Sequence, residues 1–167
     1  MAVARLVDLG VTKLWWVTSM TIAGQPTSGE ITGGKDLSTL LLPDYEFTAD
    51  ASTTIKERSV TAVVDSETPT IGKVKATLIL FRVFDVSTKL PDTTDFEQSF
   101  IGNPAGWLVR RIGLPSTTAA AAGQKVELAN FVADVPQKMG GQGTGFLKLT
   151  VPLLSQGLYF PTFTLLT

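Results

Sequence analysis

Apolar residues gather in short runs along the chain, and turn signals rich in glycine and proline separate these runs. The clearest runs are residues 11–20, 73–84, 106–113 and 125–135, in which Val, Leu, Ile, Thr and Trp predominate. β-Branched and aromatic residues of this kind favour strands over helices. The run at 73–84 begins with alternation and then becomes continuously apolar, which is typical of a strand that enters a contact on both faces.

Weaker segments complete the predicted sheet. Residues 36–47 are apolar but contain Pro43, which limits them to an edge strand or to two pieces. Residues 146–154 and 158–166 flank Ser155, Gln156 and Gly157, so we expect a terminal hairpin. Three further predictions concern shorter segments: a strand at 59–64, a turn at 65–72 and a loop at 138–145. In total we expect seven or eight strands in a mainly β, antiparallel sandwich or barrel.

Two segments have helical signals. A Thr followed three residues later by Glu is capping-box spacing, and it occurs at residues 27 to 30 and 94 to 97. The first predicts a single helical turn that ends near Gly33 and Gly34. The second predicts one short flanking helix at 92–100, with Phe96 and Phe100 on the same face.

The run GWLVRRIG at 106–113 distributes its charges in an unusual way for a strand. Side chains of a strand alternate between its faces, so each face here receives apolar residues and one arginine. Such a strand is expected to be covered on both sides, with each guanidinium near a carboxylate or at the edge of a contact. Candidate residues for a contact between subunits are Trp107, Arg110 and Arg111. Ordinary ion pairs within the domain are an equally good interpretation of the two arginines.

Composition changes this picture in one respect. The 167 residues suit one domain spanning 1–167, with 44% hydrophobic residues. Only 17% of the residues are charged, against about 25% in a typical soluble domain. Either the core is large or much of the surface contacts other chains. The net charge of −1 argues against general polyanion binding, which requires clusters of Lys and Arg.

The residue inventory offers little chemistry. The chain has no cysteine and no histidine, so the commonest nucleophiles, bases and metal ligands are missing. The glycine-rich stretch at 140–145 lacks the Lys-Ser/Thr of a phosphate loop. Asp92, Asp95 and Glu97 fit a helix start better than catalysis. We therefore predict no catalytic, cofactor or metal site. The absence of a signal peptide and of long apolar runs leads us to expect a soluble protein, made in the cytoplasm.

Several stretches, in this order, resemble the major tail tube proteins of long-tailed, non-contractile bacteriophages, particularly those that infect actinobacteria. The resemblance covers most of residues 13 to 130. It is strongest at 106–113 and in the alanine-rich segment that follows. The other matching motifs are KLWWV at 13–17, Pro26-Thr27, Glu30-Ile31, GKDL at 34–37, Gly72, Phe81-Arg82, Gly123 and Val126-Glu127.

This resemblance implies a structural protein of the phage tail. Six copies would form a ring and rings would stack into a tube, with inner strands joined in one continuous barrel around the genome DNA. DNA would pass without specific binding, and no membrane or cofactor would be involved. Partners would be further copies of the chain together with the tape-measure, terminator and distal tail proteins.

One segment becomes a candidate for contacts between rings. Residues 48–58 are mostly small and polar, and they have the character of an extended loop or arm that leaves the domain. The candidate residues of this arm are Thr48, Asp50, Ser52, Thr54, Ile55, Lys56 and Arg58. Alternative functions are the inner tube of a contractile tail or secretion system, and a tail-terminator or capsid decoration protein. An enzyme is disfavoured because no acid–base pair stands at a telling spacing.

Overall fold

A computed structural model describes residues 10–50, 54–57, 66–69, 74–92, 95–140 and 145–167. The chain is mainly β, as the sequence predicts. Eight strands form one antiparallel sheet in the order β2-β1-β7-β8-β10-β6-β3, with β9 paired to β10. The strands of this sheet are β1 Thr12–Val17, β2 Lys35–Asp36, β3 Glu46–Ala49, β6 Val74–Phe81, β7 Ala105–Ile112, β8 Lys125–Ala133, β9 Gln137–Met139 and β10 Lys148–Thr164.

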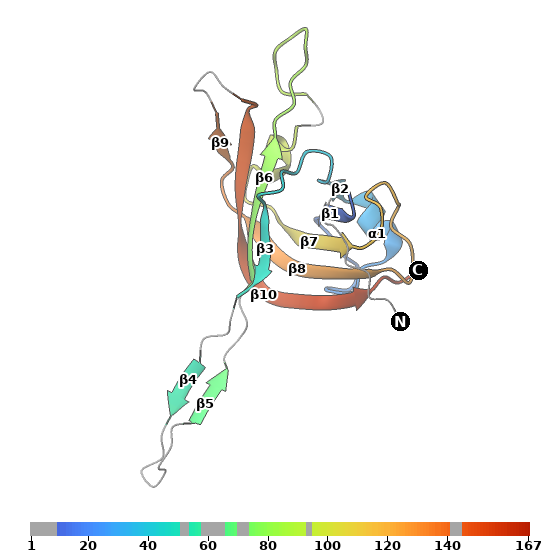
Figure 1. Cartoon of the computed structure of the whole chain (residues 1–167), viewed down its shortest axis with the longest axis vertical. Helices are drawn as coiled ribbons and strands as arrows, with labels where there is room; N and C mark the ends of the chain where they lie inside the picture. The colour runs from blue at the N-terminus through green and yellow to red at the C-terminus, as the bar shows by residue number, and fades with distance from the viewer. Residues whose placement is uncertain (1–9, 51–53, 58–65, 70–73, 93–94, 141–144) are drawn as a thin grey trace, which may run out of the picture.

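The long strand β10 divides this sheet into two halves. Its first part, as far as Leu153, pairs with β6, and its remaining part pairs with β8. Figure 1 shows β10 running alongside β6 and then bending to run beneath β8. A strand that passes from one layer to the other at a bend is the usual corner of a sandwich with crossed sheets. The expected terminal hairpin at 146–166 is therefore wrong, because both segments belong to one strand.

The Ser155-Gln156-Gly157 stretch forms a bulge instead of a turn. Pairing with β8 shifts register between Ser155 and Tyr159, and Gly157 has a positive φ of 88°. The Asn130 side chain accepts a hydrogen bond from the Leu158 amide at 2.9 Å, which satisfies a donor at the irregularity. A bulge adds residues to one strand and bends it. The residues that looked like a turn signal therefore change the direction of the strand without reversing it.

Two apolar clusters occupy opposite faces of the sheet. The larger lies between the two halves and includes Trp16, Phe47, Leu78, Leu108 and Phe131. The second lies on the other face of β1, β7 and β8, where Trp15, Trp107 and Val109 pack with Ile31 of α1 (Ser28–Gly33). The strand at 106–113 is thus covered on both sides, as its pattern predicts. Trp15 and Trp16, adjacent in the chain, are buried on opposite faces.

The two helical predictions have different outcomes. The capping box at Thr27 and Glu30 is present, and it begins α1. The predicted helix at 92–100 is only the single turn α2, Glu97–Phe100, and its N-cap Phe96 makes no side-chain cap bond. Asp95 does accept a hydrogen bond from the amide of Glu97, the first residue of α2, at 2.9 Å, as a residue at a helix start is expected to do. Asp95 and Glu97 also bind basic side chains from elsewhere in the fold. Phe96 and Phe100 do contribute to the larger cluster.

The expected arm has different limits in the structure. β4 Thr54–Glu57 pairs with β5 Ser66–Pro69 as a separate two-stranded sheet. Figure 1 shows this hairpin projecting from the end of the domain where β3 ends and β6 begins. Residues 66–69 are a strand and not the expected turn, and the strand predicted at 59–64 lies outside the described residues. Part of the expected loop at 138–145 is strand as well, because Met139 and its neighbours pair with β10.

A close backbone approach explains the first glycine of GWLVRRIG and gives a prediction. A Cβ atom on Gly106 would lie 2.5 Å from the Trp16 ring and 3.0 Å from the Val17 carbonyl oxygen. We expect Gly106→Ala to lower the free energy of unfolding by about 1–3 kcal/mol, since overpacking displaces a buried ring. Gly33→Ala is the matched control, because its Cβ would meet nothing within 4 Å. Urea unfolding measures both variants, and equal stabilities would contradict the predicted clash.

Candidate interaction surfaces

One half of the sheet presents two open strand edges. It consists of β9, the first part of β10, β6 and β3, in that spatial order. β3 pairs with β6 along one edge, and β9 pairs with β10 along one edge. Among the strands that the structure describes, none pairs with the outer edge of either strand. Open edges of this kind are templates for pairing with another chain.

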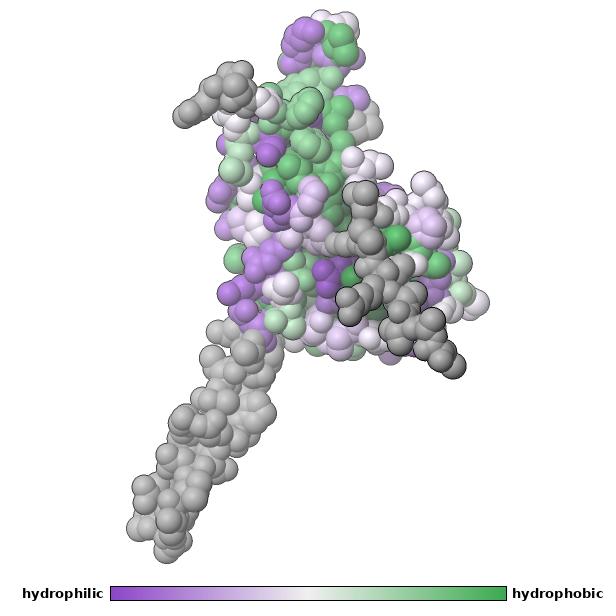
Figure 2. Space-filling model, in the orientation of Figure 1, coloured by the Kyte–Doolittle hydropathy of each residue, from purple (hydrophilic) through white to green (hydrophobic). Residues whose placement is uncertain are grey.

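The two faces of this half differ in burial. Leu78, Leu80, Leu149 and Val151 point into the larger apolar cluster. The opposite face, which we call the outer face, carries half-buried and exposed side chains. Paired across the strands, its members are Glu46, Thr48, Lys75, Thr77, Ile79, Phe81, Gln137, Met139, Lys148, Thr150 and Pro152. Threonines and a few charges of both signs occupy most of this surface. Figure 2 shows hydrophobic side chains gathered around the upper part of β6, below the protruding loop at the top of the view.

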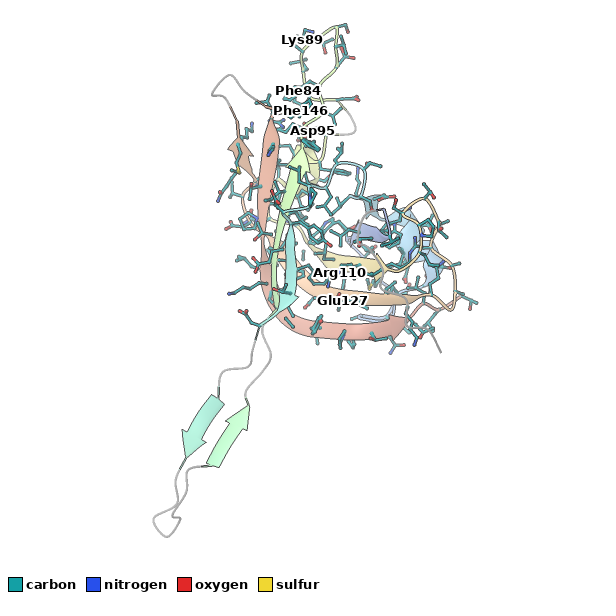
Figure 3. The ribbon with its side chains drawn as sticks, viewed as in Figure 1. Phe84, Lys89, Asp95, Arg110, Glu127 and Phe146 are labelled. Carbon is teal, nitrogen blue, oxygen red and sulfur yellow. The ribbon has the colours of Figure 1, made fainter. Side chains whose placement is uncertain are left out.

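Arg110, a predicted interface residue, binds partners within its own chain. Its Nε donates to Glu127 Oε2 at 2.8 Å, and Tyr159 donates its hydroxyl to Glu127 Oε1 at 2.7 Å. The guanidinium also lies 4.8 Å from the centre of the Phe47 ring. Burial and the bond to Glu127 raise the pKa of Tyr159 to about 12. Figure 3 labels Arg110 and Glu127 on the neighbouring strands β7 and β8. This polar cluster borders the larger apolar cluster.

Arg111 is buried on the opposite face of β7, with 1% of its surface exposed. Its two terminal nitrogens donate to four oxygens, at 2.9–3.1 Å: the carbonyls of Pro115, Thr118 and Ala119 and the side chain of Gln124. Burial lowers the pKa of this guanidinium below its ordinary value. The side chain thus fastens the alanine-containing loop over the second apolar cluster. The expected neighbouring carboxylate is not among these hydrogen-bond partners.

Trp107 lies in the second apolar cluster with 8% of its surface exposed, and its ring is 6.4 Å from the ring of Phe160. A role of Trp107, Arg110 and Arg111 in subunit contacts stays a prediction. Their contacts within one chain are those of core and core-border residues. The sequence alone could not separate the two roles, because a strand covered by its own loop has the same pattern as one covered by a neighbour.

The predicted arm residues are distributed over three parts of the structure. Thr48 belongs to the main sheet, where it pairs with Lys75 of β6. Asp50 forms an ion pair with the same lysine at 3.0 Å. Three residues lie in β4 and pair across to β5, namely Thr54, Ile55 and Lys56. Ser52 and Arg58 lie outside the described residues. The projecting element is therefore the β4–β5 hairpin, and Thr48 and Asp50 belong to its root.

One cluster that the sequence did not reveal joins distant segments at the far end of β6. Arg82 donates its Nε to Asp95 at 3.1 Å and binds Glu97 through a second nitrogen. Glu97 also accepts an ion pair from Lys138 of β9 at 2.7 Å. Arg82 and Asp95 are almost fully buried. Only the spacing of acidic residues in 92–97 hinted at this site, and the hint suggested a helix cap.

Chemistry of other kinds finds little support in the described part of the chain. No group of three or more His, Cys, Asp or Glu side chains there could hold a metal ion. No helix among the described residues is long and apolar enough to cross a membrane. One surface hollow of 570 Å³ includes Asp36, but the carboxylate of this residue pairs with Lys13 at 3.0 Å. The features that point to a function are therefore the exposed surfaces and the open strand edges.

Comparison with known proteins identifies one family. The family model for phage tail tube proteins matches residues 1–162, which is nearly the whole chain. A search of curated proteins finds no match. The matched range includes every segment that carries the sequence resemblance, and it also includes most of β10.

The contacts of Arg111 generate a prediction that differs from the sequence-based one. An interface role predicts that Arg111→Ala weakens assembly more than folding. The four hydrogen bonds instead predict a loss of roughly 2–4 kcal/mol in the free energy of unfolding, because acceptors and a cavity are left behind. Arg111→Lys keeps the charge but not the fork of donors, so we expect an intermediate loss. If Arg111→Ala leaves the free energy of unfolding in urea unchanged but prevents assembly, Arg111 acts in the subunit interface.

Proposed function

Because this chain belongs to the phage tail tube protein family, we propose that it assembles into hexameric rings that stack as a tube for genome DNA. The family is one of structural phage tail proteins, which supports a structural role and not an enzymatic one. The structural observation that carries the rest is the half-sheet β9-β10-β6-β3 with its two open edges. Each copy would offer two different edges to two different neighbours.

In this proposal, β9 of one copy pairs with β3 of the next. The contact is heterologous, since different patches meet, and such contacts generate closed rings when the rotation between copies closes. Closure would join the half-sheets into one continuous barrel and would leave no edge exposed. The short length of β9 and β3, three and four residues, suits a contact that forms only between correctly placed copies.

The outer face of the half-sheet would then line the channel. Its threonines are uncharged and Lys75 is paired with Asp50. The two other charged residues of this face, Glu46 and Lys148, are of opposite sign. Strong binding of duplex DNA requires several unpaired cations against phosphates. A nearly neutral lining therefore supports passage of DNA without specific binding. The tape-measure, terminator and distal tail proteins are the further partners in this proposal, with synthesis in the host cytoplasm and a non-contractile tail as in the phages of actinobacteria.

Disulfide trapping tests the proposed ring, because the natural chain contains no cysteine. Thr48→Cys in β3 would be combined with either Gln137→Cys or Met139→Cys in β9. We expect oxidation of the assembled protein to give a ladder that ends at six linked copies in a denaturing gel. Electron microscopy of the same samples should show rings and tubes. Each single-cysteine variant is the control and can link two copies at most.

Two outcomes would contradict the proposal. Purified chain that stays monomeric at every salt concentration and temperature, without rings or tubes, would argue against self-assembly altogether. Tubes that form normally while no cysteine pair between β3 and β9 links beyond the controls would reject these two edges as the lateral contact.

Stacking of rings gives a second prediction, centred on the β4–β5 hairpin. Ala49 and Val74 are paired neighbours at its root, so a short Gly-Gly-Ser turn can replace residues 51–73 without opening the main sheet. We expect this variant to keep the unfolding midpoint of the domain and to form rings, but not tubes. If electron microscopy shows tubes of normal length, the hairpin is not part of the stacking contact.

A further inference from the structure

The end of the domain opposite the hairpin carries an apolar surface, and the proposed ring contact does not use it. β6 connects the two ends: it begins at Val74, next to the root of the hairpin, and it finishes at Phe81. Eight residues of strand span about 23 Å between these points. Beyond Phe81 the chain forms a protruding loop, residues 84–91, which we call the end knob. Figure 1 shows the end knob and the β4–β5 hairpin at opposite ends of the longest axis.

The end knob is held in one shape by its own hydrogen bonds. Asp85 Oδ1 accepts from the amides of Ser87 and Thr88 at 2.8 and 2.7 Å. The amide of Asp85 donates to the Leu90 carbonyl at 2.9 Å, and Phe84 and Pro91 form a bridge at the base. Hydrogen bonds from Ser87 and Thr88 lower the pKa of Asp85 to about 2. The carboxylate therefore stays ionised, and the loop keeps these bonds, at any pH used for assembly.

The buried ion cluster fixes the base of the end knob on the sheet. Arg82 lies directly before it and binds Asp95 and Glu97, and the guanidinium lies 4.9 Å from the centre of the Phe84 ring. Lys138 extends the cluster to β9. In the view of Figure 3, Phe84, Phe146 and Asp95 are labelled below the loop that carries Lys89. The end knob is thus positioned by charges taken from three separate segments.

This ordered loop exposes apolar side chains. Val86 is 83% exposed and Leu90 is 64% exposed. At the same end of the domain Phe146, 78% exposed, packs its ring edge-on against Phe81, the last residue of β6, at 5.6 Å. A hollow of 370 Å³ lies at the same place, lined by Phe81, Met139, Gly140, Gly145, Phe146 and Lys148. Large exposed apolar patches on a folded protein mark interaction sites, and preorganisation lowers the entropic cost of binding.

We propose that this end surface, defined by Phe84, Val86, Leu90 and Phe146, binds the hairpin-bearing end of a second copy stacked along the tube. The proposal rests on the proposed function and adds the receiving half of the axial contact. A second copy is the occupant because the family assembles as a tube, and a stack of identical rings must join two unlike ends. The end knob and the hairpin project at those two ends of each chain.

Two substitutions on the end knob test this assignment. Val86→Asp and Leu90→Asp place charges on exposed positions, so the unfolding midpoint should stay unchanged. We expect the double variant to form rings but no tubes in electron microscopy. Ile22→Asp is the matched control, since Ile22 is also an exposed aliphatic residue at 55% and lies near α1, away from the end knob. Tubes of normal length from the double variant would overturn the assignment.

Mixing experiments determine the polarity of the contact. Rings of the double variant retain an intact hairpin end, and rings without the hairpin retain an intact end surface. Each variant alone should give single rings, whereas an equal mixture should give double rings that grow no further. A mixture that contains single rings only would overturn the pairing of these two ends.

The same experiments separate this inference from the proposed function. If wild-type protein forms no rings, the proposed function fails, and the axial contact fails with it. If wild-type tubes form while the double variant cannot form even single rings, then the end surface belongs to the lateral contact. In that case the ring proposal stands and the axial assignment is overturned.

Discussion

The backbone pairing of β10 with two different partners is the constraint on which the rest of the fold depends. Leu153 is the residue at which β6 on one side gives way to β8, since it pairs with Ala76 and with Ala133. The other strands of the sheet lie in one layer or the other according to the part of β10 on whose side they are paired. The larger apolar cluster exists because the bend at Ser155–Gly157 brings the two halves face to face, as the edge-on contact between Phe47 and Phe131 illustrates. Without the bend, one flat sheet would leave these rings in water.

The two halves of the sheet differ in how much of their surface is buried within the chain. The half formed by β1, β7 and β8 is covered on both faces, by the larger cluster on one side and by α1 and the 115–124 loop on the other. Its arginines are used internally, Arg110 with Glu127 and Arg111 with backbone carbonyls. The half formed by β9, β6 and β3 has one buried face and open edges. A protein that must be stable alone and yet join neighbours benefits from this division, because the contacts that form later do not disturb the core.

The charged side chains of this protein are few, and some of them hold separate segments together. Only 17% of the residues of the chain are charged. Several of these charges join separate segments of the chain. Arg82 with Asp95 and Glu97 is an example, in which three side chains from distant positions hold a protruding loop on the sheet. Buried ion pairs are costly to desolvate, but they specify one arrangement, because removal of either partner leaves an uncompensated charge.

The sequence by itself determined the β class, the capping box of α1 and the resemblance to phage tail tube proteins that the family match confirms. It also predicted strands at 11–20, 73–84, 106–113 and 125–135, which the structure has at 12–17, 74–81, 105–112 and 125–133. These features depend on side-chain periodicity and local hydrogen bonds, which neighbouring residues fix. Only the tertiary structure decided that 148–164 is one bent strand and that residues 54–57 pair with residues 66–69. It alone also decided that Arg111 faces backbone carbonyls. Each of these outcomes depends on partners far away in the chain. A Ser-Gln-Gly stretch can turn or bulge, and a buried guanidinium can meet a carboxylate or a carbonyl. Long-range packing selects between such alternatives, and no local pattern records the selection.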